Sequence, residues 1–109
     1  MIFVAGDVVG RRLSDSRGRT VGRVTAFYRY PTDLRAPWGV AAVTRGKVFK
    51  ATHLVDLCDA QIDGHDVVVS YPGDKIEAAP HYQPLIGNTL ADHHAVEVLD
   101  HYRGAGRPT

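Results

Sequence analysis

The sequence predicts a mainly β fold: a small barrel of five or six short strands, with one short helical turn and a C-terminal α-helix. Short branched-aliphatic runs are separated by turns rich in Gly, Pro, Asp and Ser, which is the pattern of a compact β protein. Asp63-Gly64 is a strong hairpin dipeptide. Helical spacing of apolar residues occurs in one segment, after residue 88. The 109 residues fit one domain, expected over 1–104 with its helix at 89–103, and 105–109 are expected to be a flexible tail.

The stretch 7–29 is expected to form the hairpin that opens the sheet. Its turn lies at 14–19, where Asp and Ser can bond their own backbone and Gly18 can adopt a positive φ. The apolar residues of the two strands are Val8, Val9 and Leu13 before the turn, and Val21, Val24 and Phe27 after it. This second set breaks the two-residue period of a strand, so a β-bulge is expected near Thr25-Ala26.

The middle of the chain is expected to supply the remaining strands. Two prolines exclude a central strand from 30–37, so this segment is predicted to be a loop. Strands are expected at 38–44 and 48–55, joined by a turn at 45–47. A short hairpin at 60–70 follows, and its three consecutive valines indicate burial on both faces.

Two helices are expected near the end of the chain. A one-turn helix spans 74–77, with Asp74 as its cap. After a linker at 81–88, Thr89 is expected to cap the longer helix, which Gly104 ends. Its apolar stripe consists of Ala91, Ala95, Val98, Leu99 and Tyr102.

The segment 7–28 resembles the start of a PRC-barrel domain, with an aliphatic-Gly strand, an Asp-containing turn ending in Gly, and an aliphatic-Gly-x-Val strand. The resemblance extends to about residue 104 through Leu57, Ala60, 67–71, Ile76, Ala79-Pro80 and 101–104. Asp56 and Leu90 depart from it, because proline is frequent at both places. The resemblance implies a non-enzymatic adaptor or assembly module that acts through protein contacts, and it carries no shared catalytic residues. The family includes a photosynthetic reaction-centre subunit and a ribosome maturation factor.

The charge distribution, the cysteine content and the hydrophobic segments limit the class of protein. Residues 1–55 carry ten Lys or Arg and three Asp, whereas residues 56–109 carry three Lys or Arg and nine Asp or Glu. We expect these charges to interleave in one domain and largely neutralise each other. The single cysteine, Cys58, excludes an internal disulfide and is interpreted as a small core residue. Because no segment resembles a signal peptide or a membrane span, a cytoplasmic location without membrane insertion is expected.

Motifs for catalysis or cofactor binding are not found, so the chain is predicted not to be an enzyme and to need no cofactor. His93, Glu97 and His101 are spaced four residues apart and resemble a metal ladder. The outer two would lie about 12 Å apart along a helix, so one ion would reach two of them at most. A solvated helix face is the preferred interpretation, and the three residues stand as lesser metal candidates.

The main binding hypothesis concerns a run of arginines beside two aromatic residues. Arginine next to tyrosine can bind phosphate and stack on bases. The candidate binding residues are Arg11, Arg12, Arg17, Arg19, Arg23, Tyr28 and Tyr30. The alternative function is therefore an RNA- or ribosome-associated factor, although charged strands also serve to protect sheet edges. A homodimer is a further expectation, from the oppositely charged halves and the amphipathic helix; the protein partner itself is unknown.

Overall fold

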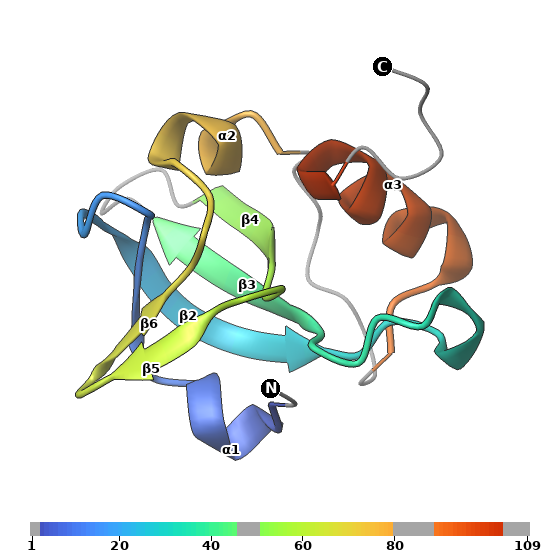
Figure 1. Ribbon diagram of the computed structural model, residues 1–109, viewed down its shortest axis with the longest axis horizontal. Helices are drawn as coiled ribbons and strands as arrows, with labels where there is room; N and C mark the ends of the chain where they lie inside the picture. Colours follow the sequence, from blue (N-terminus) through green and yellow to red (C-terminus); the bar gives the residue numbers. More distant parts are fainter. Residues whose placement is uncertain (1–2, 46–50, 80–88, 104–109) are drawn as a thin grey trace.

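The computed structural model describes residues 3–45, 51–79 and 89–103, which form a six-stranded mixed sheet with short helices beside it (Figure 1). The strands are β1 (Arg12–Ser14), β2 (Thr20–Tyr28), β3 (Val40–Arg45), β4 (Ala51–Asp56), β5 (Gln61–Asp63) and β6 (Asp66–Val68). The helices are α1 (Ala5–Val8), the 3-10 turn η1 (Thr32–Leu34), α2 (Gly73–Glu77) and α3 (Asp92–Arg103).

The strand order is β4-β3-β2-β1-β6-β5, and all neighbours are antiparallel except β1 and β6. The prediction of a mainly β domain of five or six strands, with a short helix and a C-terminal helix, is confirmed, and the described sheet has six strands. Strands β4 and β5 are the two edges, so the described strands form an open sheet rather than a closed barrel.

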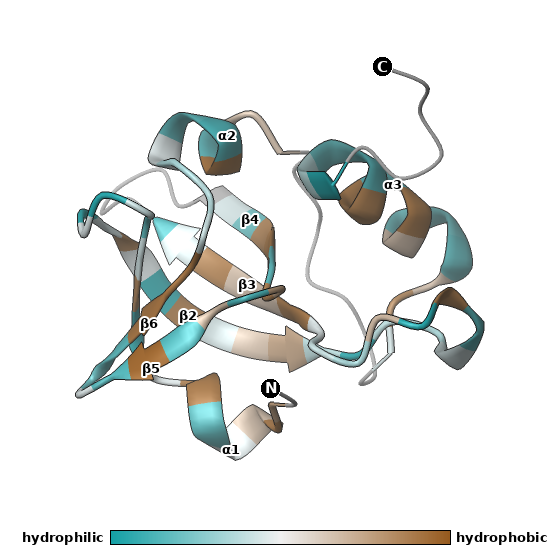
Figure 2. Cartoon of the chain, in the orientation of Figure 1, coloured by the Kyte–Doolittle hydropathy of each residue, from teal (hydrophilic) through white to brown (hydrophobic). Residues whose placement is uncertain are grey.

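Strand alternation gives the sheet an apolar inner face and a polar outer face. On the inner face, Leu13 pairs with Val67 and Val24 pairs with Val43, and all four are buried. One polar row crosses all six strands of the outer face: Thr52, Thr44, Arg23, Arg12, Asp66 and Asp63. Figure 2 shows hydrophilic residues also gathered at the turns that join β1 to β2 and β5 to β6. The outer face therefore presents charged and hydroxyl side chains.

The first strand is shorter than predicted, because the chain before it forms a helical turn. The carboxylate of Asp7 accepts a hydrogen bond from the backbone N–H of Val4 at 3.1 Å, which caps the N-terminus of α1. Gly10 then turns the chain at φ +91°. Val8 is buried, but it belongs to α1 rather than to a strand, and Val9 is 43% exposed. The prediction that Val8 and Val9 belong to the opening strand is therefore wrong.

Strand β2 has the predicted irregularity. Its pairing with β3 shifts register between Val24 and Ala26, which is the expected bulge. Gly18 adopts the expected positive φ, at +81°. Gly22 is needed for close approach, because a Cβ atom there would lie 2.5 Å from the Thr44 carbonyl oxygen. β2 can therefore lie close against β3 at this point.

Helices α2 and α3 both contact the edge strand β4. Four of the five predicted stripe residues of α3 are buried, namely Ala95, Val98, Leu99 and Tyr102, while Ala91 is exposed. Thr89 does not cap the helix: it forms a bridge with Arg29, and α3 begins three residues later. Asp74 does not cap α2 either, because the helix starts at Gly73 after Pro72.

Several expectations concern residues outside those described: the centre of the 45–47 turn, the start of the 48–55 strand with Phe49, the 81–88 linker, Gly104 as a stop, and the 105–109 tail. In the described segments, none of the helices has the length and apolar character that crossing a bilayer requires.

Candidate functional site

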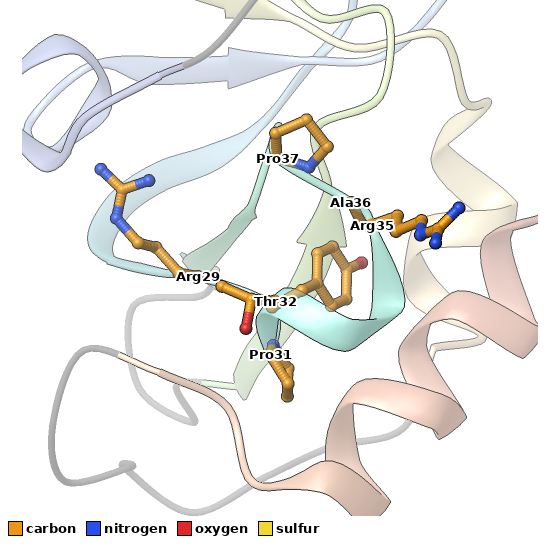
Figure 3. Close-up of a pocket in the computed structure, with 7 residues that line it drawn as sticks. Arg29, Pro31, Thr32, Arg35, Ala36 and Pro37 are labelled. Carbon is orange, nitrogen blue, oxygen red and sulfur yellow. The ribbon is translucent and has the colours of Figure 1, made fainter.

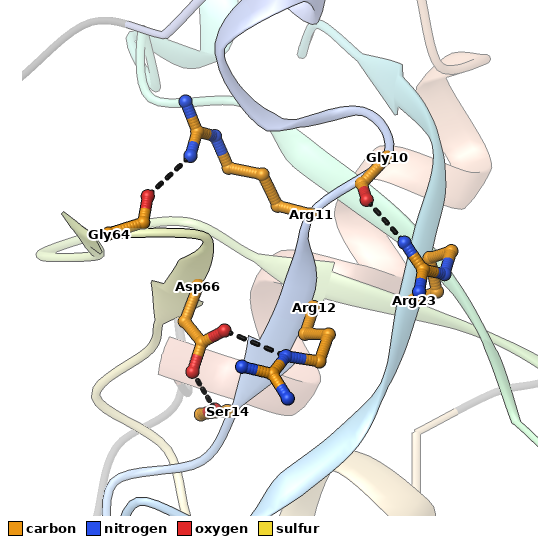
Figure 4. Close-up of polar contacts among 7 residues, drawn as sticks. All are labelled: Gly10, Arg11, Arg12, Ser14, Arg23, Gly64 and Asp66. Atoms are coloured by element: carbon orange, nitrogen blue, oxygen red, sulfur yellow. Dashed lines mark hydrogen bonds and ion pairs between the residues drawn. The ribbon is translucent and has the colours of Figure 1, made fainter.

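Three of the predicted arginines come together on the outer face of the sheet (Figure 4). Arg12 lies directly opposite Arg23 in the β1–β2 ladder, and Arg11 immediately precedes β1. With Gly10 and His65 they line a shallow hollow of about 360 Å³, which we call the arginine hollow. The β5–β6 turn, which carries His65, forms one side of it. The structure therefore groups residues that the sequence places in two separate segments.

Main-chain carbonyl groups hold two of these arginines in place. The Nε atom of Arg11 donates to the Asp7 carbonyl at 2.5 Å, and its Nη1 atom donates to the Gly64 carbonyl at 2.6 Å. Nη1 of Arg23 donates to the Gly10 carbonyl at 2.7 Å. Such bonds orient a guanidinium group without cancelling its charge. Arg12 instead forms an ion pair with Asp66 at 3.0 Å.

The other two predicted arginines, Arg17 and Arg19, lie at the opposite end of the hairpin. They share a hollow of about 390 Å³ with Arg45 and with the acidic residues Asp15, Asp74 and Glu77. Arg45 forms an ion pair with Glu77. Positive and negative side chains are balanced here, so this end of the hairpin is much less basic than the arginine hollow.

Asp15 organises the turn between β1 and β2, as the turn chemistry predicts. Its Oδ1 atom accepts hydrogen bonds from the backbone N–H groups of Arg17 and Arg19, both at 2.9 Å. Burial alone would raise the pKa of the Asp15 carboxyl, but the backbone hydrogen bonds from Arg19 and Arg17 outweigh burial and lower this pKa.

Tyr28 and Tyr30 do not join the arginines. They are 7% and 4% exposed, and both belong to the hydrophobic core. Their rings are therefore not presented for stacking on a base, as the hypothesis of a binding surface of arginines beside these two tyrosines requires.

Tyr30 instead belongs to a buried polar cluster centred on Asp56, which is 0% exposed. Oδ2 of Asp56 accepts hydrogen bonds from the Tyr30 hydroxyl at 2.5 Å and from Nε1 of Trp38 at 2.8 Å. Oδ1 accepts from the Tyr71 hydroxyl at 2.7 Å and from the Cys58 backbone N–H at 2.9 Å. A carboxylate only accepts hydrogen bonds, so it matches four converging donors. The Asp56 cluster, consisting of these five residues, fastens β4 to the 30–38 loop and to the segment before α2.

Helix α3 closes this cluster from outside. The Tyr102 hydroxyl donates to the Leu54 carbonyl at 2.6 Å, and the Tyr102 ring packs 4.7 Å from that of Tyr71. The Arg103 guanidinium lies 5.2 Å above the Trp38 ring and donates to Sγ of Cys58 at 2.7 Å. Burial raises the pKa of the Cys58 thiol even though Arg103 opposes this shift, so the thiol is not activated. The prediction that Cys58 is a core residue is confirmed.

The three tyrosines around Asp56 resist ionisation. Burial raises the pKa of Tyr30, Tyr71 and Tyr102, and the nearby negative charge of Asp56 raises each pKa further. In the unfolded chain these hydroxyls would titrate near the ordinary value of about 10. Folding therefore depends on their staying protonated.

We expect the free energy of unfolding to be unaffected by these tyrosines below about pH 10 and to fall above it. The unfolded chain then binds fewer protons than the folded chain, and three such groups give a slope approaching about 4 kcal/mol per pH unit. Urea denaturation between about pH 9 and pH 11 measures this slope. Tyr102→Phe removes one titrating group and should reduce the slope by about one third. Equal slopes for wild type and variant would contradict this explanation.

The lesser metal candidates His93, Glu97 and His101 do not assemble into a site. His101 donates from Nε2 to the Lys75 carbonyl at 2.7 Å, which joins α3 to α2. His93 and Glu97 are exposed on the same helix. Across the part of the chain that the structure describes, no group of three His, Cys, Asp or Glu side chains is placed to hold a metal ion.

A third hollow, of about 470 Å³, lies along the loop that contains η1 (Figure 3). The described residues that line it are Arg29, Tyr30, Pro31, Thr32, Arg35, Ala36 and Pro37. In Figure 3 the side chains of Arg29 and Arg35 extend to opposite sides of the hollow. This hollow is lined by two arginines rather than three, so it is less basic than the one lined by Arg11, Arg12 and Arg23.

Sequence reasoning missed the role of Asp56, which it noted only as a departure from the PRC-barrel resemblance. The available signal was an acidic residue between Val55 and Leu57, inside an apolar run. Such a residue is buried only where donors surround it.

Neither the scan against models of known protein families nor the search of curated proteins found a match for this chain.

Proposed function

We propose that the chain is a PRC-barrel-type module that acts as a non-enzymatic adaptor, binding a protein partner through the outer face of its sheet. The order of elements supports this proposal: a turn-linked strand pair containing glycines, two further strands, a short hairpin, a one-turn helix and a C-terminal helix. The resemblance of the sequence to that family agrees with the same order.

The placement of reactive side chains supports a role without catalysis. Asp56 and Cys58 are buried and engaged in structural contacts, and the three nearby tyrosines have raised pKa values. Catalytic acids, bases and nucleophiles need access to substrate and a pKa suited to their task. Among the described residues, the groups that would be the first candidates for chemistry instead hold the fold together.

The observation that carries the proposal is the arginine hollow. Arg11 and Arg23 are oriented by main-chain carbonyl groups and keep their charge on the outer face. Desolvated or ordered arginines are frequent anchors of protein interfaces, because their donors are already positioned. A partner with acidic groups would therefore find an ordered positive surface here.

The alternative, binding to RNA, receives less support. A nucleic-acid backbone is best bound along a continuous positive track, often with exposed aromatic rings. Arg17 and Arg19 lie apart from the hollow and beside three acidic residues, and Tyr28 and Tyr30 are buried. Arg11, Arg12 and Arg23 thus form one compact positive site rather than part of a continuous track.

Affinity capture from the native cell extract tests the adaptor role. Immobilised wild-type chain is compared with Arg23→Glu, which reverses one charge in the hollow, and with Arg17→Glu, which makes the same change at the far turn. We expect a protein that wild type and Arg17→Glu retain at physiological salt and that Arg23→Glu loses. Light scattering of the purified chain shows whether this partner is a second copy. Capture that is insensitive to Arg23→Glu would refute the role of this face.

A further inference from the structure

The arginine hollow contains more positive charge than its surroundings neutralise. Arg12 and Arg23 are directly opposite in an antiparallel ladder, where like charges destabilise the strand pair. Asp66 is the one carboxylate that forms an ion pair with this group in the described parts of the chain, and it pairs with Arg12. Two guanidinium charges, those of Arg11 and Arg23, are therefore left over.

These two groups are also prepared for a ligand. A guanidinium has five N–H donors in a rigid fork. The described contacts use two donors of Arg11 and one donor of Arg23, and in Figure 4 the bond from Arg11 to Gly64 and the bond from Arg23 to Gly10 lie on either side of β1. The carbonyl contacts fix both side chains, so less rotamer freedom is lost when the remaining donors bind an anion.

The surplus charge indicates the kind of anion. A phosphate monoester carries close to two negative charges at neutral pH and has three acceptor oxygens. It can therefore match both unpaired guanidinium groups, whereas a single carboxylate matches one. Arginine forks suit phosphate oxygens geometrically, and His65 lines the same hollow. The volume of about 360 Å³ leaves room for the group that bears the phosphate.

We propose that Arg11, Arg12, Arg23 and His65 form a binding site for a phosphate monoester. Arg11 and Arg23 provide the charge and most of the donors, and Arg12 stays paired with Asp66 beside the ligand. This inference deepens the adaptor role, since the phosphate would mark the partner protein. The binding chemistry itself is tested with small probes, so the site and the adaptor role can fail separately.

The test is a titration of the isotopically labelled full chain followed by amide chemical shifts. The main probe is a short peptide with one phosphoserine and otherwise uncharged residues. Comparison probes are the unphosphorylated peptide, the same peptide with Glu at that position, inorganic phosphate and a single-stranded RNA oligonucleotide. The proteins are wild type, Arg23→Gln, Arg23→Lys and the control Arg17→Gln. An unchanged amide spectrum without ligand verifies that each variant is folded.

We expect saturable shifts at Gly10, Arg11, Arg12, Arg23 and His65 with the phosphopeptide. Loss of a charge-assisted bidentate contact should raise Kd at least about tenfold in Arg23→Gln, with a smaller increase in Arg23→Lys, which keeps the charge but not the fork. Arg17→Gln should change Kd less than about twofold, because the Arg17 side chain lies in the turn between β1 and β2, away from the arginine hollow. The unphosphorylated and Glu peptides should bind at least about tenfold more weakly.

Three results would overturn the site: equal losses for Arg17→Gln and Arg23→Gln, equal binding of the Glu peptide and the phosphopeptide, or tighter binding of the RNA with shifts at both ends of the hairpin. A separate comparison, of the phosphopeptide with inorganic phosphate, distinguishes a protein-borne phosphate from a free one. Phosphopeptide binding at least about tenfold tighter than inorganic phosphate supports a protein-borne phosphate. Equal affinities support the site but refute its link to the adaptor role.

Discussion

Asp56→Asn should lower the free energy of unfolding by about 3 kcal/mol or more, although the two side chains have nearly the same shape. Each carboxylate oxygen of Asp56 accepts two hydrogen bonds in a site that is closed to solvent. The amide of Asn has one accepting oxygen and one donating nitrogen. Two of the four donors therefore lose their acceptor.

Neither orientation of the Asn amide avoids this loss. If its nitrogen replaces Oδ2 it faces Nε1 of Trp38, and if it replaces Oδ1 it faces the backbone N–H of Cys58. Both of these groups can only donate, whereas a tyrosine hydroxyl can rotate and accept. Each orientation thus places two donors against each other inside the core, where an unsatisfied polar group is costly.

Urea denaturation followed by the fluorescence of Trp38, the single tryptophan, measures the effect at the cluster itself. Asp63→Asn is the matched control, because Asp63 is exposed on the edge strand β5 and should change stability by less than about 0.5 kcal/mol. Similar stabilities for Asp56→Asn and Asp63→Asn would mean that the buried carboxylate does not hold these segments together.

Gly39→Ala is expected to cost about 2–4 kcal/mol, the second largest effect, because two penalties combine. Gly39 has a φ of +79°, which L-residues rarely adopt. An added Cβ atom would lie 2.5 Å from the buried Phe27 ring and 3.0 Å from the Tyr28 carbonyl oxygen. The residue also follows Trp38, so displacement of the chain here would pull the indole away from Asp56.

Gly64→Ala separates the two penalties. Gly64 has a similar positive φ, +61°, but no atom lies within 4 Å of its added Cβ. Gly64→Ala should lower the free energy of unfolding only by the cost of the positive φ, about 1 kcal/mol. Equilibrium urea denaturation of both variants gives the difference, which measures the crowding against Phe27. Equal losses for the two variants would show that crowding contributes nothing.

The parts of the fold that depend on local sequence could be predicted. The turn at Gly18, the hairpin around Asp63-Gly64, the bulge in β2 and most of the stripe of α3 follow from residues within a few positions of each other. Two errors, at α1 and at the start of α2, were local, whereas others arose where distant contacts decide. Thr89 pairs with Arg29 instead of capping α3, and this partner is far away in the sequence.

The candidate site was predictable only in part for the same reason. Arg12 and Arg23 are opposite each other because the hairpin turn sets their register, so local sequence suffices. His65 and Asp66 join them through the parallel pairing of β1 with β6, which the sequence does not reveal. Tyr30 was misassigned because its partner, Asp56, lies in a strand much later in the chain. Tyr30 was assigned to the arginines because it is near them in the sequence, but it is buried in the core.

The central functional claim is that the arginines of the hollow serve binding rather than stability. Thermal unfolding of wild type and Arg23→Gln, with and without inorganic phosphate at matched ionic strength, tests this claim most directly. Without phosphate, the variant should be at least as stable as wild type, because a like-charge pair is removed. Phosphate at about ten times its Kd should raise the Tm of wild type by about 4 °C or more and leave the variant nearly unchanged. A variant that is markedly less stable without phosphate, or equal phosphate effects on both proteins, would contradict the claim.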